Sequence, residues 1–193
     1  MIASTVATAL DWRLVDNELV AEVAARAGVS PQEVAEREER PSTFIERLAR
    51  VTALELPELF LPTAGPLQEH GESSFVRITR SLVEELAAEG RCIVVGRASA
   101  AVLARASDTL HVRIVAPKPF RIRRAMELLG TDREAAERKL EATDSNRIRY
   151  HREYYHRDSN DAANYDMVLN TERLGVDGST RVILARAKAL GWS

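Results

Sequence analysis

Apolar positions along this chain recur at the two spacings that distinguish helices from strands. Segments in which an apolar residue returns every three or four positions predict helices. They cover residues 2–10, 17–27, 72–89, 98–103 and 177–190, and two further helices start at Ser30 and Pro41. Short apolar runs that end at glycine or polar residues predict strands instead. They cover residues 12–15, 92–95, 109–116 and 167–169.

Two helices in the second half of the chain have recognisable end signals. One follows Pro117 and runs to Leu129, and Gly130 comes next as its C-cap. The run Thr131-Asp132-Arg133-Glu134 then has the form of a capping box, with its threonine as the N-cap. This signal predicts a long charged helix that reaches Tyr155 or beyond.

The alternation of short strands with helices predicts an α/β domain built around a parallel sheet. The run 92–95 is continuously apolar between two glycines, which predicts a strand buried on both faces. Ligands of such sheets bind at the carboxyl ends of the strands. The polar residues that follow the predicted strands are therefore the first site candidates: Asp16, Gly96, Arg97, residues 117–124, Asn170 and Thr171.

Composition narrows the class of protein without identifying it. The chain has 193 residues, 45% of them hydrophobic, which fits one globular domain. No apolar run approaches the ~18 residues of a membrane helix, and the first residues lack the basic segment of a signal peptide. The single cysteine, Cys92, excludes an intramolecular disulfide. We therefore expect a cytoplasmic protein without a membrane partner, and the net charge of -2 argues against broad nucleic-acid binding.

Three arginines at the start of the helix after Pro117 form one candidate anion site. Arg121 and Arg124 are three positions apart and share a helix face, and Arg123 lies between them. Positive charge opposes the helix dipole at this end, and a bound anion would relieve the conflict. A solvated basic face is the alternative interpretation.

The segment 144–157 concentrates arginine and aromatic side chains. It holds four arginines, two histidines and three tyrosines. In a helix, Arg147, Tyr150 and Tyr154 share one stripe. Arginine beside tyrosine suits phosphate binding next to a stacked base, so Arg149 and Tyr150 are candidate substrate-binding residues. A charged helix with a tyrosine seam is the alternative, and the two histidines lack the further ligands of a metal site.

Residues 21–35 have the pattern helix, glycine turn, helix, which helix-turn-helix DNA-binding proteins share. The second helix carries four glutamates, which would face DNA phosphates unfavourably: Glu33, Glu36, Glu38 and Glu39. Two packed helices are therefore favoured, and a DNA-binding regulator is kept as the alternative outside enzymology.

Several motifs occur in the order and spacing of a known family. They are Val15-Asp16-Asn17-Glu18-Leu19, Ile93-Val94-Val95-Gly96-Arg97, the run 121–127, Asp144-Ser145-Asn146-Arg147, Tyr154-Tyr155 and the run 164–175. With them the chain resembles the cytidylate kinase-like family, a branch of the P-loop nucleoside monophosphate kinases. The resemblance implies phosphoryl transfer from ATP, with Mg²⁺ carried by the nucleotide, to a nucleoside monophosphate such as CMP. It also implies one domain over residues 1–193 with a three-layer parallel sheet, a helical acceptor-binding insertion at 30–75 and a lid at 130–160.

The resemblance further implies a role for each candidate side chain. Arg97 would hold the acceptor phosphate, and Asp16 would lie beside it. Arg147, placed by Asp144, would reach the transferring phosphoryl group when the lid closes. Arg121 and Arg124 would support the nucleotide phosphates. Phosphoryl transfer needs positioning and positive charge more than covalent chemistry, which suits a site rich in arginine.

The chain departs from the family pattern in three places. The family's glycine-rich phosphate-binding loop and its strand do not precede Ile2-Ala3, Asn17 replaces the usual arginine, and Ala98 replaces a frequent aspartate. We therefore expect these 193 residues alone to have little or no kinase activity. Either a longer native N-terminus or a partner segment supplies the loop, or the chain binds nucleotides or proteins without catalysis. The expected partners are nucleotides, with no nucleic acid favoured and a homo-oligomer left open.

Overall fold

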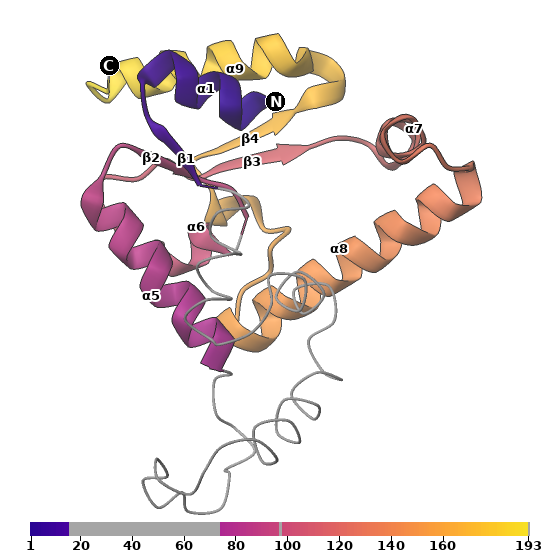
Figure 1. The fold of residues 1–193 in the computed structure, drawn as a ribbon, viewed down its shortest axis with the longest axis horizontal. Helices are drawn as coiled ribbons and strands as arrows, with labels where there is room; N and C mark the ends of the chain where they lie inside the picture. Colours follow the sequence, from indigo (N-terminus) through magenta and orange to yellow (C-terminus); the bar gives the residue numbers. More distant parts are fainter. Residues whose placement is uncertain (16–73, 97, 193) are drawn as a thin grey trace, which may run out of the picture.

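A computed structural model describes residues 1–15, 74–96 and 98–192, in which helices and strands alternate (Figure 1). In chain order the elements are α1 (Ile2–Leu10), β1 (Arg13–Val15), α5 (Ser74–Glu89), β2 (Cys92–Val94), α6 (Ser99–Val102), β3 (Val112–Val115), α7 (Lys118–Leu129), α8 (Arg133–Tyr155), the 3-10 helix η2 (Ala162–Asn164), β4 (Met167–Asn170) and α9 (Thr171–Ala189). Several predictions lie outside the described residues: the helix at 17–27, those from Ser30 and Pro41, nearly all of the insertion at 30–75, the helix-turn-helix alternative, Asp16 and Arg97.

The ends of α7 and α8 show how well local signals locate helices. Gly130 ends α7 in the left-handed region with φ 60°, as expected of a C-cap. The prediction that Thr131 caps α8 is wrong, because Asp132 is the N-cap and its side chain accepts a hydrogen bond from Ala135 N at 2.8 Å. A carboxylate at this position also interacts favourably with the positive end of the helix dipole.

The described strands form two separate two-stranded sheets, both parallel. β1 pairs with β2, with Leu14 opposite Ile93, and β3 pairs with β4, with Ile114 opposite Leu169. Helices α1 and α9 lie side by side on one side of these strands, and α5 and α6 lie on the other (Figure 1). The predicted α/β fold with parallel strands is therefore confirmed. The described strands do not make the single sheet that was expected, because β2 and β3 are not paired.

Two apolar clusters hold the helices against the strands. One joins β1 and β2 to α5 and centres on the fully buried Val15 and Val83. The other joins α1 and α9 to β3 and β4 and includes Val6 and Ile183. Ile93 of β2 packs against this second cluster, whereas its neighbours in β2 pack against the first. Successive side chains of a strand point to opposite faces, so β2 contributes to both cores.

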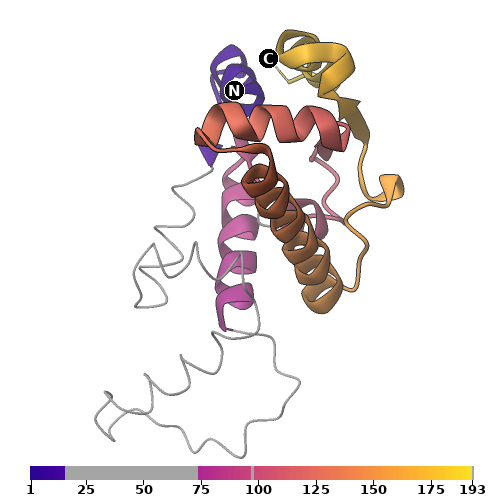
Figure 2. The same cartoon turned by 90° about the vertical axis from the view of Figure 1, so that its right-hand side faces the viewer.

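Helices α7 and α8 form a hairpin that leaves the strands after β3, and α8 then returns toward α5 (Figures 1 and 2). At the far end of α8, the guanidinium of Arg80 in α5 lies 5.6 Å from the ring centroid of Tyr155. Just beyond the helix, Arg157 donates a hydrogen bond to Ala100 O in α6 at 3.1 Å. The helix expected to form the lid is thus anchored at its C-terminal end on α5 and α6.

Candidate active site

Ion pairs join α7 to α8 along the hairpin. Lys118 Nζ lies 2.6 Å from a carboxylate oxygen of Glu137 and 2.6 Å from one of Glu141. One turn further along α7, Arg121 donates from Nη1 and Nη2 to the two oxygens of Asp144, each at 2.7 Å. A bidentate pair fixes orientation as well as distance. Charged side chains therefore hold the two helices in one register.

Asp144 lies between two arginines. Besides Arg121, it meets Arg147 one turn later on α8, with Arg147 Nη1 at 3.5 Å from Asp144 Oδ1. The pKa of Asp144 is lowered, chiefly by the hydrogen bonds from Arg121 and further by the charges of Arg147 and Arg113, although partial burial opposes the shift. The carboxylate is therefore ionised near neutral pH, and it can position the arginines but does not carry a proton.

Aromatic side chains continue the site along α8. The Tyr150 ring centroid lies 6.4 Å from that of His151. Burial lowers the pKa of His151, and the charges of Arg147, Arg113 and Arg157 lower it further. The imidazole is therefore neutral at pH 7 and is surrounded by positive charge. An electropositive wall next to a tyrosine ring is suited to a phosphate-bearing ligand.

The candidate residues that the structure describes fall into two groups. Four of them line one cavity: Arg121, Asp144, Arg147 and Tyr150. Arg124 and Arg149 instead bond to neighbours on their own helices, and neither lines that cavity. The roles assigned to all six stay predictions.

Sequence reasoning did not single out Arg113 and Asn160 of the cavity wall, and it included Tyr165 only as part of the family run 164–175. Arg113 Nη2 donates a hydrogen bond to Asn160 Oδ1 at 2.6 Å, and the Arg113 guanidinium carbon lies 5.4 Å from the Tyr165 ring centroid. The sequence did give one indication that Arg113 is unusual, because it is a charged residue in the middle of the predicted apolar strand 109–116. No local signal pairs that residue with Asn160, 47 positions later.

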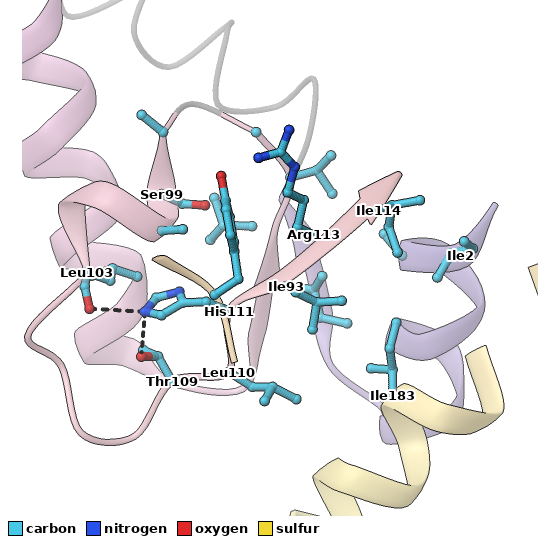
Figure 3. Close-up of a pocket in the computed structure, with 18 of the residues that line it drawn as sticks. Ile2, Ile93, Ser99, Leu103, Thr109, Leu110, His111, Arg113, Ile114 and Ile183 are labelled. Carbon is cyan, nitrogen blue, oxygen red and sulfur yellow. Dashed lines mark hydrogen bonds between the residues drawn. The ribbon is translucent and has the colours of Figure 1, made fainter. Parts of the chain in front are cut away.

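The cavity extends from these polar residues into an apolar region between β2 and β3 (Figure 3). Its volume is about 1860 Å³, which exceeds the ~300–1,000 Å³ of common ligand pockets. Four isoleucines from α1, β2, β3 and α9 line the apolar region: Ile2, Ile93, Ile114 and Ile183. The cavity is therefore larger than a small ligand needs, and part of its lining is as apolar as a protein core.

An unpaired edge of β2 borders the apolar region. The backbone groups of Arg91 and Val95 bond to β1. Backbone groups alternate between the two edges of a strand, so those of Cys92 and Val94 point away from β1. The prediction that this strand is buried on both faces is wrong, since its residues are only half-buried. The physical reason is that this edge of β2 has no neighbour among the described strands.

The near edge of β3 is unpaired as well. His111 O accepts a hydrogen bond from Met167 N at 3.2 Å, which directs the His111 backbone toward β4. The alternation then points the backbone groups of Val112 and Ile114 away from β4, and Ile114 is 44% exposed. No strand in the described part of the chain pairs with this edge. An extended apolar segment would satisfy both edges and fill the space between them.

Comparison with known proteins decides what kind of chain carries this arrangement. The family model for the cytidylate kinase-like family matches residues 1–173. The chain belongs to the cytidylate kinase-like family. The resemblance drawn from the sequence motifs is thereby confirmed.

Individual relatives are more distant. A cytidylate kinase of Methanopyrus kandleri is 31% identical over 109 residues, which cover 52% of this cytidylate kinase-like chain and 56% of the relative. The match thus spans little more than half the length of that protein. The crystal structure of an uncharacterized protein from Eubacterium ventriosum ATCC 27560 has a TM-score of 0.68 at 20% identity, covering 97% of this chain and 90% of the other. At that identity the likeness concerns the fold alone.

The described residues show neither a membrane-spanning helix nor a metal-binding cluster. None of their helices is long and apolar enough to cross a membrane. Within the same residues, no group of three or more histidine, cysteine, aspartate or glutamate side chains is arranged to hold a metal ion.

Proposed function

We propose that this chain carries the acceptor-binding and lid parts of a nucleoside monophosphate kinase built on a P-loop type of α/β sheet. The enzyme would transfer the terminal phosphoryl group of ATP to a pyrimidine nucleoside monophosphate such as CMP. The observation that carries the proposal is Asp144, held between Arg121 and Arg147 in the wall of a large cavity. Membership of the family supports the reaction class, and the Methanopyrus kandleri cytidylate kinase supports CMP as the acceptor.

Of the two arginines that hold Asp144, Arg147 has more freedom to reach a phosphoryl group. Its contact to Asp144 is a single one at 3.5 Å, and its side chain is 57% exposed. Arg121, in contrast, is bound by both of its terminal nitrogens. We assign Arg147 to the transferring phosphoryl group and Asp144 to holding it in place. An arginine in that role contributes about 10³ or more to the rate.

The remaining candidates complete the proposed site. Tyr150 would contact the base or ribose, since its ring lies on the cavity wall next to the cationic side chains. Arg97, with Asp16, would bind the acceptor phosphate, and Arg124 and Arg149 would add positive charge toward the nucleotide phosphates. The assignments of Arg97, Asp16 and Arg124 follow from the family motifs, and that of Arg149 follows from its place beside Tyr150.

The ATP phosphates need a cradle of backbone N–H groups. The described residues include no glycine-rich turn that could form one. Ile2, at the N-terminus of α1, and Ile114 of β3 both line the apolar region of the cavity (Figure 3). A strand placed between β2 and β3 would therefore end close to the start of α1. We propose that such a strand, from sequence preceding Met1 in the native protein or from a partner chain, completes both the sheet and the phosphate cradle.

Consequences follow for the polypeptide of 193 residues taken alone. It would bind an acceptor nucleotide but turn over ATP slowly or not at all, because its described residues form no phosphate cradle and Mg²⁺ arrives only with bound ATP. A nucleotide- or protein-binding role without catalysis is the second candidate, and the two unpaired strand edges favour it if no segment ever fills the gap.

Thermal unfolding with nucleotides tests the proposal directly. CMP, or an analogue that joins ATP to CMP, should raise the melting temperature of the polypeptide. Arg97→Ala should abolish that rise, while Arg138→Ala, on the exposed face of α8, should leave it unchanged. The absence of stabilisation by any nucleoside monophosphate would count against the kinase assignment.

A further inference from the structure

Arg113 is a charged residue in the middle of β3, and its surroundings fix the plane of its guanidinium group. Its Nη2 is bound to Asn160 Oδ1 at 2.6 Å, and its guanidinium lies over the ring of Tyr165. Tyr165 is held in turn, because its hydroxyl donates a hydrogen bond to Ser159 O at 3.0 Å. Arg113 therefore has a defined orientation in the cavity wall (Figure 3).

Two polar groups in this part of the wall have no partner among the described residues. Arg113 Nη1 and Ser159 Oγ are both buried from water, and neither makes a hydrogen bond there. Ser159 as a whole is only 3% exposed. Buried polar groups in native proteins are nearly always paired, so two unpaired donors on one cavity wall indicate a partner that is not part of the described chain. That partner must accept hydrogen bonds.

The local charge indicates which kind of acceptor fits. The charge of Asp144 is already paired with Arg121, whose two terminal nitrogens bind its two oxygens. Several arginines act on the same part of the wall, since the pKa of His151 is lowered first by burial, then by the charge of Arg147 and then by those of Arg113 and Arg157. An anionic oxygen would be favoured over a neutral one at this position.

We propose that Arg113 is a substrate-contacting residue whose Nη1 donates a hydrogen bond to a phosphate oxygen of the bound nucleotide, with Ser159 Oγ as a second donor. The inference rests on the proposed function and deepens it, because it places a phosphate contact on β3, outside every motif that carried the family resemblance. Two alternatives have different consequences. A trapped water could bridge the two donors, or Arg113 could serve only to brace the loop that contains Asn160.

Calorimetric titration of the 193-residue polypeptide with pyrophosphate, and separately with CMP, tests the contact. Arg113→Gln removes the charge, and we expect pyrophosphate affinity to fall about ten- to a hundredfold, as for a lost hydrogen bond between charged groups. Arg113→Lys keeps the charge without the planar fork and should lose less. Arg138→Gln removes the same charge from a side chain that is 63% exposed, and affinity should change by less than about threefold.

Asn160→Ala distinguishes contact from bracing, because it removes the partner of Nη2 and leaves Nη1 in place. A loss of pyrophosphate affinity clearly smaller than that of Arg113→Gln supports the contact, because Nη1 stays in place and the Tyr165 ring still holds the guanidinium. A loss as large as that of Arg113→Gln shows bracing and overturns the proposal. Unchanged binding by Arg113→Gln, the result expected of a trapped water, overturns it too, and so does a failure of the unmodified polypeptide to bind pyrophosphate. If pyrophosphate binding depends on Arg113 but the native protein does not phosphorylate CMP from ATP, the proposed function is refuted and the Arg113 contact stands.

Discussion

Breaking the Arg121–Asp144 pair should destabilise the protein more than breaking an ion pair on the outer face of α8. The inner pair is bidentate at 2.7 Å, and its side chains are 31% and 36% exposed. The outer pair, Arg138 with Glu134, has side chains that are 63% and 84% exposed. Solvent screens exposed pairs, so we expect a coupling free energy of about 1 kcal/mol or more for the inner pair and about 0.3–0.5 kcal/mol for the outer one.

Two double-mutant cycles measure these couplings. One uses Arg121→Gln, Asp144→Asn and the double variant, and the other uses Arg138→Gln, Glu134→Gln and their double variant. Urea unfolding at neutral pH gives the free energy of unfolding of each protein. An inner coupling no larger than the outer one would refute the conclusion that this pair fixes the register of α7 and α8.

The same pair predicts a dependence of stability on pH. The folded pKa of Asp144 is lower than its unfolded value of about 3.9. Its contribution is therefore fully present above that value and is lost as the pH falls through the lowered folded pKa. Asp144→Asn should reduce the loss of stability in this acid range, measured as the urea midpoint at successive pH values. An unchanged acid slope would contradict the reasoning.

Three further predictions concern single residues. In the native protein, Arg147→Ala should lower kcat for CMP phosphorylation by about 10³, and Arg138→Ala should leave it nearly unchanged, as measured by steady-state ADP release. The folded pKa of His151 is lowered, so stability present above the unfolded pKa of about 6.5 should decline as the pH falls toward the folded value, and His151→Gln should remove that decline in urea unfolding. Gly130→Ala should cost about 1 kcal/mol of unfolding free energy, because Gly130 has a φ of 60° and its added methyl group would meet no other atom within 4 Å.

Local sequence signals located most of the described helices, although α9 begins at Thr171 and not at the predicted position 177. Ile2, Val6 and Leu10 recur at helical spacing, and all three belong to or pack against the same apolar cluster. The start of α8 was misplaced by one position because threonine and aspartate are adjacent there and both are good N-caps. A choice between two neighbouring caps depends on how the preceding turn packs, which local sequence does not encode.

The candidate site was predictable where one helix carries it. Asp144, Arg147 and Tyr150 are each three positions apart, so a single helix brings them to one cavity wall. Arg113 was not predictable, because an arginine in a strand has the same sequence pattern whether it points to solvent or into a cavity. Its partner Asn160 comes from a distant loop, and such long-range contacts leave no periodic signal.

The separation of the described strands into two sheets could not be predicted from local sequence either. The edges of β2 and β3 are each apolar enough to belong to a continuous sheet, and nothing local shows that they lack a common neighbour. The family resemblance predicted that a strand is missing. The cavity between the two strand edges is where such a strand would lie.

The most direct test of the kinase assignment is CMP-dependent ATP turnover, measured side by side on the protein isolated from its own cells and on the polypeptide of residues 1–193. We predict sustained turnover by the native protein and little or none by the polypeptide, because the proposed enzyme needs a further strand between β2 and β3 and a phosphate-binding turn after it. Robust turnover by the polypeptide alone would contradict the need for that strand. Absence of turnover by the native protein with every nucleoside monophosphate tried would contradict the kinase assignment itself.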